Sequence, residues 1–330
     1  MSTSISESGE VYGAEALPGL PFGGGPTYDR IVTAGDATVT VTSVVELIAC
    51  LPDLSPGSCV FLPGSACLDF TANHYVDKLP PLVVPAGVTV ASDRGHDGSP
   101  GALLVSDDVS LAAFFETGGD GCRFTGFRLR GPARGEYIEH WRRTTGGGAP
   151  GYYALPTQRG IVCQHSTTVI DNLRLSEFSH AGILVASGDC NISASHIAGC
   201  RRKGLGYGIT VKSASAIIHR NIFGENRHSI ASTGEPGSSY RVRNNLFVAQ
   251  GSSHTVDVHK DASTSAAGDS IDVQSNCFSH PAAHPAVYLR ALPTGLCLVR
   301  RNWFQNYHAS GVKAVRVNTI ARVDDNKVGL

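Results

Sequence analysis

Apolar and polar residues recur in one short pattern from Phe124 to the C-terminus. The pattern is an apolar residue, two variable residues, an Asn, one variable residue and a second apolar residue, and we call each copy an Asn row. Successive Asn positions fall 24 to 31 residues apart, a period typical of repeat architectures. The copies are Ile218–Phe223, Val242–Phe247, Val273–Phe278, Val299–Phe304 and Val323–Val328, while Phe124–Leu129, Ile170–Leu175 and Ile192–Ile197 keep the phase without Asn.

A second element lies between the Asn rows. It reads apolar, variable, apolar, and it is usually opened by a small residue. Such alternation predicts short β-strands. Strands of this length cannot bury a face alone, so copies at this spacing are expected to stack on one another as a solenoid. The clearest copies are 160–163, 182–185, 208–211, 255–258, 286–289 and 314–317.

The N-terminal region is predicted to cover the open end of the solenoid. Ser43 with Glu46 three residues later is a capping box, and the apolar Leu47 follows on a short helix. We therefore divide the chain into an irregular arm at 1–27 and a solenoid domain at 28–330. The cap is expected at about 38–55, and the long segment 131–159 is expected to be a loop insertion.

Composition limits the possible functions. The 330 residues are 42% hydrophobic and 17% charged, which excludes disorder, and the 38 glycines fit an architecture with many turns. A formal net charge of −1 argues against coating nucleic acid. The 9 cysteines show no metal spacing. Without an apolar span or a signal peptide in the given chain, we expect a soluble protein and no membrane partner. The compartment stays open, secreted or cytoplasmic.

The repeat resembles that of right-handed parallel β-helix proteins of the pectate-lyase-like superfamily, from about Pro56 onward. The resemblance implies an all-β solenoid of three short strands a coil, with an Asn ladder at one tight turn. Asn suits such a turn because it tolerates left-handed backbone geometry and bonds to backbone groups. Some relatives use calcium, but the sequence shows no carboxylate cluster for it, so no cofactor is expected. The ladder would be Asn221, Asn245, Asn276, Asn302 and Asn326.

Alternation along the strands between Asn rows predicts which residues point outward. With Ile209, Val256 and Val287 inward, the residues one and three positions later point out. The resemblance implies that this face lines a substrate groove. The first outward column is Thr210, Ala231, Asp257, Tyr288 and Arg316, and the second is Lys212, Thr233, His259, Arg290 and Asn318.

Four members of these columns suggest proton abstraction. His259 can act as a base near neutral pH. Arg290 can neutralise a substrate carboxylate, Tyr288 can return a proton, and Asp257 can orient His259. Segment 254–261 also resembles the Asp-x-His-Asp element of β-helical mannuronan C5-epimerases, although Lys260 intervenes before Asp261.

Basic and aromatic residues around these columns suggest an anionic ligand. Arginines pair with carboxylates, and aromatic rings stack on sugars. The candidate substrate-binding residues are Lys212, Arg227, His228, His254, Trp141, Arg143 and Tyr153.

The sequence thus predicts a carbohydrate-active enzyme, a lyase or C5 epimerase, on an acidic, uronate-containing polysaccharide or oligosaccharide. One alternative is a β-helical glycoside hydrolase that uses a carboxylate pair, with Asp257 joined by Asp261, Asp272 or Glu235. The other is a non-catalytic carbohydrate-binding solenoid. We expect a monomer or small homo-oligomer.

Overall fold

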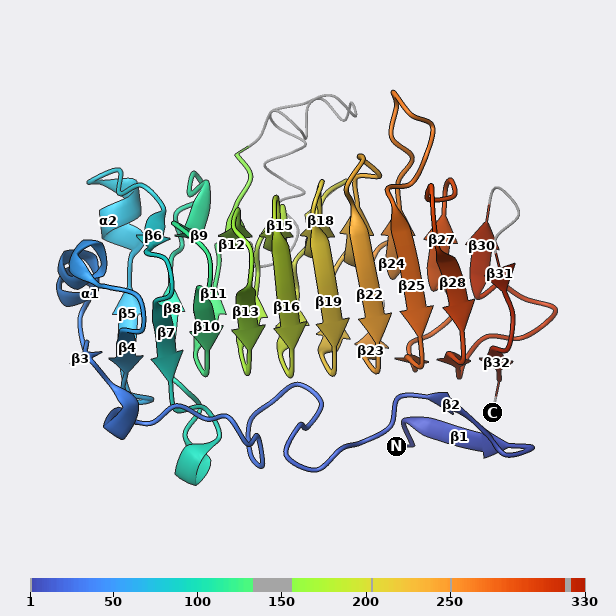
Figure 1. The fold of residues 1–330 in the computed structure, drawn as a ribbon, viewed down its shortest axis with the longest axis horizontal. Helices are drawn as coiled ribbons and strands as arrows, with labels where there is room; N and C mark the ends of the chain where they lie inside the picture. Colours follow the sequence, from blue (N-terminus) through green and yellow to red (C-terminus); the bar gives the residue numbers. More distant parts are fainter. Residues whose placement is uncertain (1, 133–155, 203, 250, 318–321, 330) are drawn as a thin grey trace.

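Three parallel sheets wind the chain into a parallel β-helix in the computed structural model (Figure 1). The structure describes residues 2–132, 156–202, 204–249, 251–317 and 322–329. Neighbouring coils pair in register, so that Ile183 lies between Ile161 and Ile209 on adjacent strands. The predicted all-β solenoid is confirmed.

Within the described ranges, each coil adds one strand to each sheet in turn. The eleven-stranded sheet consists of β3 (Val39–Thr40), β4 (Cys59–Leu62), β7 (Thr89–Ser92), β10 (Arg123–Thr125), β13 (Thr168–Asp171), β16 (Asp189–Ser193), β19 (Ser215–His219), β22 (Ser239–Arg243), β25 (Ser270–Gln274), β28 (Cys297–Arg300) and β31 (Arg322–Val323). The ten-stranded sheet consists of β5 (Cys67–Asp69), β8 (Leu103–Val105), β11 (Arg128–Arg130), β14 (Arg174–Ser176), β17 (His196–Ala198), β20 (Ile222–Gly224), β23 (Leu246–Ala249), β26 (Cys277–Phe278), β29 (Trp303–Phe304) and β32 (Lys327–Val328). The nine-stranded sheet consists of β6 (Leu82–Val84), β9 (Ala113–Thr117), β12 (Arg159–Cys163), β15 (Ala181–Val185), β18 (Tyr207–Val211), β21 (His228–Ser232), β24 (Val256–Val258), β27 (Val287–Leu289) and β30 (Val315–Val317).

Each Asn row forms the corner between the eleven-stranded and ten-stranded sheets. The side chain of Asn276 accepts a hydrogen bond from the backbone N–H of Asn245 at 3.0 Å and donates one to the Val242 carbonyl at 2.8 Å. The left-handed residue is the one before each ladder Asn, such as Asn244 or Ser275, each with φ of 53°. The expectation that left-handed geometry selects Asn at the ladder position is therefore wrong. The ladder Asn is selected for its amide, which bonds backbone groups that are buried away from water.

The core is one continuous column of apolar side chains inside the coils. The Phe that ends four Asn rows shows how successive coils pack. Phe247 lies between Phe223 and Phe278 with ring centroids 5.1 and 4.5 Å away, and Phe304 continues the stack at 4.8 Å. Burying these rings stabilises each coil only when its neighbour is present.

Short helices cover the N-terminal end of the solenoid (Figure 1). Helix α1 (Val44–Cys50) begins after Ser43, whose side chain accepts from the Glu46 N–H, and its Leu47 is fully buried. Helix α2 (Thr71–Tyr75) lies in the first coil. The 3-10 turns are η1 (Ala34–Asp36), η2 (Leu51–Asp53) and η3 (His96–Gly98). In the described part of the chain, no helix is long and apolar enough to cross a membrane.

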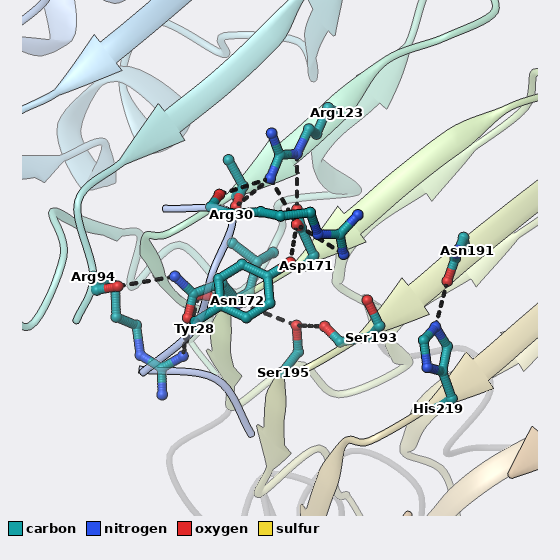
Figure 2. Close-up of polar contacts among 12 residues, drawn as sticks. Tyr28, Arg30, Arg94, Arg123, Asp171, Asn172, Asn191, Ser193, Ser195 and His219 are labelled. Atoms are coloured by element: carbon teal, nitrogen blue, oxygen red, sulfur yellow. Dashed lines mark hydrogen bonds and ion pairs between the residues drawn. The ribbon is translucent and has the colours of Figure 1, made fainter. Parts of the chain in front are cut away.

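The N-terminal arm runs along the Asn-row corners from the last coils back toward the first (Figure 1). It opens with an antiparallel hairpin of β1 (Ser4–Glu7) and β2 (Glu10–Gly13). The backbone N–H of Gly13 donates to the Arg301 carbonyl at 2.9 Å, and that of Gly25 donates to the Asn172 side chain at 2.7 Å. Farther along, the Tyr28 hydroxyl donates to Asp171, which Arg123 also binds (Figure 2). The segment expected to be irregular thus includes a hairpin.

Candidate active site

The residues predicted to lie together surround the outward face of β24, on the nine-stranded sheet. Asp257 pairs in register with Ala231 on one side and Tyr288 on the other, as the first outward column requires. The expectation that Asp257 lies on an exposed strand is wrong, because this side chain is 0% exposed. Side chains from its own coil and from both adjacent coils cover it.

Arg290 and Asp257 form a two-point ion pair. The Arg290 Nε and Nη2 atoms donate to Oδ1 and Oδ2 of Asp257 at 2.9 and 2.7 Å. Burial opposes the charge on Asp257, but hydrogen bonds from His259 and Arg290 hold the pKa of this carboxyl well below its usual range. The carboxylate is therefore ionised at neutral pH, and Arg290 is committed to it.

His259 joins the buried carboxylate to the surface. Its Nε2 lies 3.0 Å from Oδ2 of Asp257, so in the neutral ring this nitrogen carries the proton and donates it to the carboxylate. The side chain is 40% exposed. Within the described residues Nδ1 has no hydrogen-bond partner, which leaves its lone pair available to a ligand.

Two further histidines lie beneath the surface beside Asp257. The His228 Nδ1–H donates to the His254 carbonyl at 2.6 Å, and the His228 Nε2 lies 3.3 Å from Asp257 Oδ2. Burial lowers the pKa of His228 to about 3, although the Asp257 charge opposes this shift. Burial also lowers the pKa of His254. Because His228 is fully buried, the prediction that it contacts a substrate is wrong. Its proton is on Nδ1, so its Nε2 faces Asp257 without donating a hydrogen bond.

A pocket of about 380 Å³ opens next to His259 on the same sheet. Among the described residues that line it there are three cationic side chains and no carboxylate. A pocket of this size with three cationic lining residues favours a small anionic group of a larger ligand. Its charged, aromatic and imidazole residues are Arg159, His180, Tyr207, Lys212, His259 and Lys260.

Sequence reasoning did not name Arg159, His180 or Tyr207 as site residues. The Arg159 Nε donates to Nδ1 of His180 at 2.9 Å. Burial, together with the charges of Arg159 and Arg202, lowers the pKa of His180 to about 4, so the ring is neutral with its proton on Nε2. Tyr207 stacks on His228 with ring centroids 5.6 Å apart. The sequence signal was their place at the strand starts: Arg159 and Tyr207 directly precede the opening glycines Gly160 and Gly208, and His180 lies two residues before Gly182.

The other predicted site residues fall in different places. Lys212 lines the pocket, with its Nζ 3.8 Å from a carboxylate oxygen of Glu235. Tyr288 lies between the guanidinium groups of Arg290 and Arg316, 5.2 and 4.9 Å from its ring centroid, and not on the pocket lining. Arg227 is half-buried and also lies off the lining. Trp141, Arg143 and Tyr153 lie outside the described residues.

His228, His254 and Asp257 are close enough together to suggest a metal site. Each offers one ligand atom, and these atoms lie within 4.8 Å of one another. However, both oxygens of Asp257 already accept hydrogen bonds from Arg290. A divalent cation would have to share this carboxylate with a guanidinium, so the donor set fits a metal poorly. We derive no step through one.

Comparison with solved structures finds distant similarity. An alginate lyase from Paenibacillus sp. str. FPU-7 has a TM-score of 0.39 and 14% sequence identity, over 89% of this chain and 100% of that one. The Dettilon tailspike protein has a TM-score of 0.42 and 12% identity, over 88% of this chain and 67% of that one. No protein-family model and no curated protein matches the chain. We therefore derive the chemistry from the side chains of this chain.

Proposed function

We propose that this protein is a lyase or C5 epimerase of uronate-containing polysaccharides, with His259 as the base. The observation that carries the proposal is the pocket itself. Its described lining residues include three cations and no carboxylate, and the histidine at its edge is hydrogen-bonded through one ring nitrogen to a buried, ionised Asp257. A group with this arrangement is suited to removing a proton from a bound anion.

The cations would supply the electrostatic part of the reaction. The positive charges of Arg159, Lys212 or Lys260 would neutralise a bound uronate carboxylate. The C5 proton next to that carboxylate then becomes more acidic, because the charge that develops on the carboxylate is stabilised. Lys212 keeps the role predicted for it, whereas Arg290 acts on Asp257 and not on substrate.

The proton transfer can be written in full. The lone pair on Nδ1 of His259 takes the C5 proton, and the C5–H electron pair moves toward the carboxylate. In the lyase reaction this pair forms the C4–C5 double bond while the C4–O4 bond breaks, and O4 leaves with a proton from the Tyr207 hydroxyl. In the epimerase reaction O4 stays, and C5 receives a proton on its opposite face from the Tyr207 hydroxyl, which water then reprotonates.

Tyr207 suits the role of proton donor better than Tyr288. Tyr207 lines the pocket, whereas Tyr288 lies off the lining between two arginines. Tyr207 is on β18 and His259 follows β24, two coils later, so their backbones are roughly 10 Å apart along the axis.

The hydrolase alternative is less well supported. A glycoside hydrolase of the usual kind needs two carboxyl groups on either side of the scissile bond. None of the described lining residues is Asp or Glu, and Asp261 binds its own turn through Ser263 and Thr264. Asp272 is buried on the eleven-stranded sheet, where Arg243 binds it. Glu235 stays at the pocket margin, next to Lys212.

The test is an assay of purified protein on polymannuronate, polyguluronate and polygalacturonate. A lyase gives the ultraviolet absorbance of a new double bond. An epimerase incorporates deuterium at C5 from D₂O without that absorbance. We expect His259→Ala to abolish the reaction and Tyr207→Phe to slow the lyase reaction. His308→Ala, an exposed histidine away from the pocket, is the matched control. New reducing ends without a double bond would establish a hydrolase instead, and binding without turnover a carbohydrate-binding solenoid.

A further inference from the structure

The ten-stranded sheet carries a second group of basic residues, away from the candidate active site. Arg128, Arg174 and His196 each begin a strand, and they lie in one register column on β11, β14 and β17. Neighbours in such a column are about 4.8 Å apart at the backbone. Like charges at this spacing destabilise a sheet unless something compensates them.

A third arginine reaches the same place from the loop after β7. The Arg94 Nη1 donates to the carbonyl and the side-chain oxygen of Asn172 at 3.1 and 3.0 Å (Figure 2). The N-terminal arm closes this side, since the Gly25 N–H binds the same Asn172 oxygen. Arg94 is thus fixed in position before any ligand arrives, which reduces the entropic cost of binding one.

The described carboxylates do not balance these charges. No Asp or Glu oxygen lies within 4.0 Å of a nitrogen of Arg94, Arg128 or Arg174 in the described part of the chain. Burial and the Arg174 charge lower the pKa of Arg94 to about 10, and burial with both arginines lowers the pKa of His196.

These side chains surround a hollow of about 250 Å³, bounded also by Gly25 and Ser99. No Asp or Glu is among the described residues that line it. The adjoining hollow, which shares Arg174 and His196, does contain Glu177 and Glu225. Of these, Glu225 pairs with Arg201, with nitrogen and oxygen 3.1 Å apart.

We propose that this hollow is a binding site for a tetrahedral oxyanion, a sulfate or phosphate group. The guanidinium groups of Arg94, Arg128 and Arg174 together carry more positive charge than one carboxylate would neutralise. They reach the hollow from a loop and from two strands. Paired guanidinium N–H donors match the oxygens of such a group. The site lies on a different sheet from the candidate active site, so the proposal stands independently of the function proposed above.

The test uses the full-length protein with inorganic sulfate, inorganic phosphate or acetate, at constant ionic strength set with sodium chloride. We expect millimolar sulfate or phosphate to raise Tm by about 2 °C or more at saturation, through preferential binding to the folded state. Titration calorimetry should give a single site. Acetate at the same concentration should have little effect. A response to acetate alone would overturn the oxyanion assignment, and the ratio of the sulfate and phosphate affinities identifies the preferred group.

Arg174→Gln separates a binding role from a structural one. Because the variant removes one of several uncompensated like charges, we expect its anion-free Tm to equal or exceed that of the parent. We also expect its sulfate affinity to fall at least tenfold. Arg241→Gln, at an exposed arginine of the eleven-stranded sheet, is the matched control and should bind sulfate as the parent does. An unchanged sulfate response in Arg174→Gln, or a parent protein that does not respond, rules the site out.

Discussion

Asp257 and Asp171 are both fully buried carboxylates that each accept two hydrogen bonds from one guanidinium. Arg290 binds Asp257 at 2.9 and 2.7 Å, and Arg123 binds Asp171 at 3.1 and 2.7 Å. The side chain that makes the third contact differs between them. Asp171 binds Tyr28 of the N-terminal arm, whereas Asp257 binds His259 at the edge of the pocket. The same residue pair therefore anchors a segment in one place and orients a candidate base in the other.

Replacing Asp257 by Asn tests this orienting role. The amide keeps the shape but removes the charge that stabilises the protonated His259 during proton abstraction. We expect the turnover rate to fall roughly 10²- to 10⁴-fold, the size of a general-base contribution. The unfolding free energy should fall by about 2–3 kcal/mol. This is at or below the lower end of the range for breaking a buried salt bridge, because Arg290 can turn toward solvent. Rates on the best uronate polymer and urea unfolding measure the two effects.

Asp272→Asn is the control for that variant. Asp272 is also buried and is also bound by an arginine, Arg243, but it lies on another sheet. We expect a stability loss of similar size and an unchanged rate per folded molecule. If the two variants lose activity equally, Asp257 contributes only to folding.

His180 should make stability depend on pH. Its pKa is lowered in the folded protein to about 4 by burial and by Arg159 and Arg202, whereas an unfolded histidine takes up its proton near pH 6.5. Between these values the unfolded state binds more protons, so the stabilisation is complete above about pH 6.5 and is lost as the pH falls toward 4. The urea midpoint should therefore fall less between pH 7.5 and pH 4.5 in His180→Gln than in the parent. A parallel fall would contradict the assignment.

At the scale of elements, the sequence pattern specified most of the fold, because each repeat places the same residue type in the same environment. Five rows place an Asn amide at the corner, and four of them end in a core Phe, so the repeat can be recognised directly in the sequence. The first outward column was also correct in register. The predictions that Asp257 is exposed and that His228 contacts a substrate were wrong. Whether an outward residue is buried depends on how far side chains such as Arg290 and the neighbouring histidines extend across adjacent coils. Alternation contains no information about that reach.

The Asn ladder should be the most sensitive element to a single substitution. Asn276 donates to Val242, Gln274 and Asn302 and accepts from Asn245, all in buried positions. In Asn276→Ala these buried groups lose their partner, at about 1–3 kcal/mol for each group left unsatisfied. We expect a total loss of roughly 3 kcal/mol or more in urea unfolding. Asn306→Ala, at an exposed Asn that also bonds a backbone carbonyl, should cost less than 1.5 kcal/mol.

At the scale of the whole molecule, the N-terminal arm joins coils that are far apart in the solenoid (Figure 1). In a stack where each coil contacts only its neighbours, the terminal coils have one neighbour and unfold most easily. The hairpin contacts the last coils, where the Tyr12 hydroxyl donates to Asp325 at 2.7 Å and the Lys327 ammonium donates to Glu7 at 2.6 Å. We infer that the arm stabilises the C-terminal end and links it to the first coils.

Two glycines of the hairpin provide a matched test of this link. Gly9 and Gly13 both have positive φ, 84° and 92°, so alanine introduces similar backbone strain at each. A Cβ on Gly9 would meet nothing within 4 Å, whereas one on Gly13 would lie 2.5 Å from the Thr3 carbonyl and 3.2 Å from Trp303. We therefore expect Gly13→Ala to weaken docking and Gly9→Ala to preserve it. Hydrogen exchange should show faster exchange at Trp303–Phe304 and Lys327–Val328 in Gly13→Ala alone, with Thr168–Asp171 in mid-solenoid unchanged. Equal exchange in both variants would mean that the last coils are stable without the hairpin.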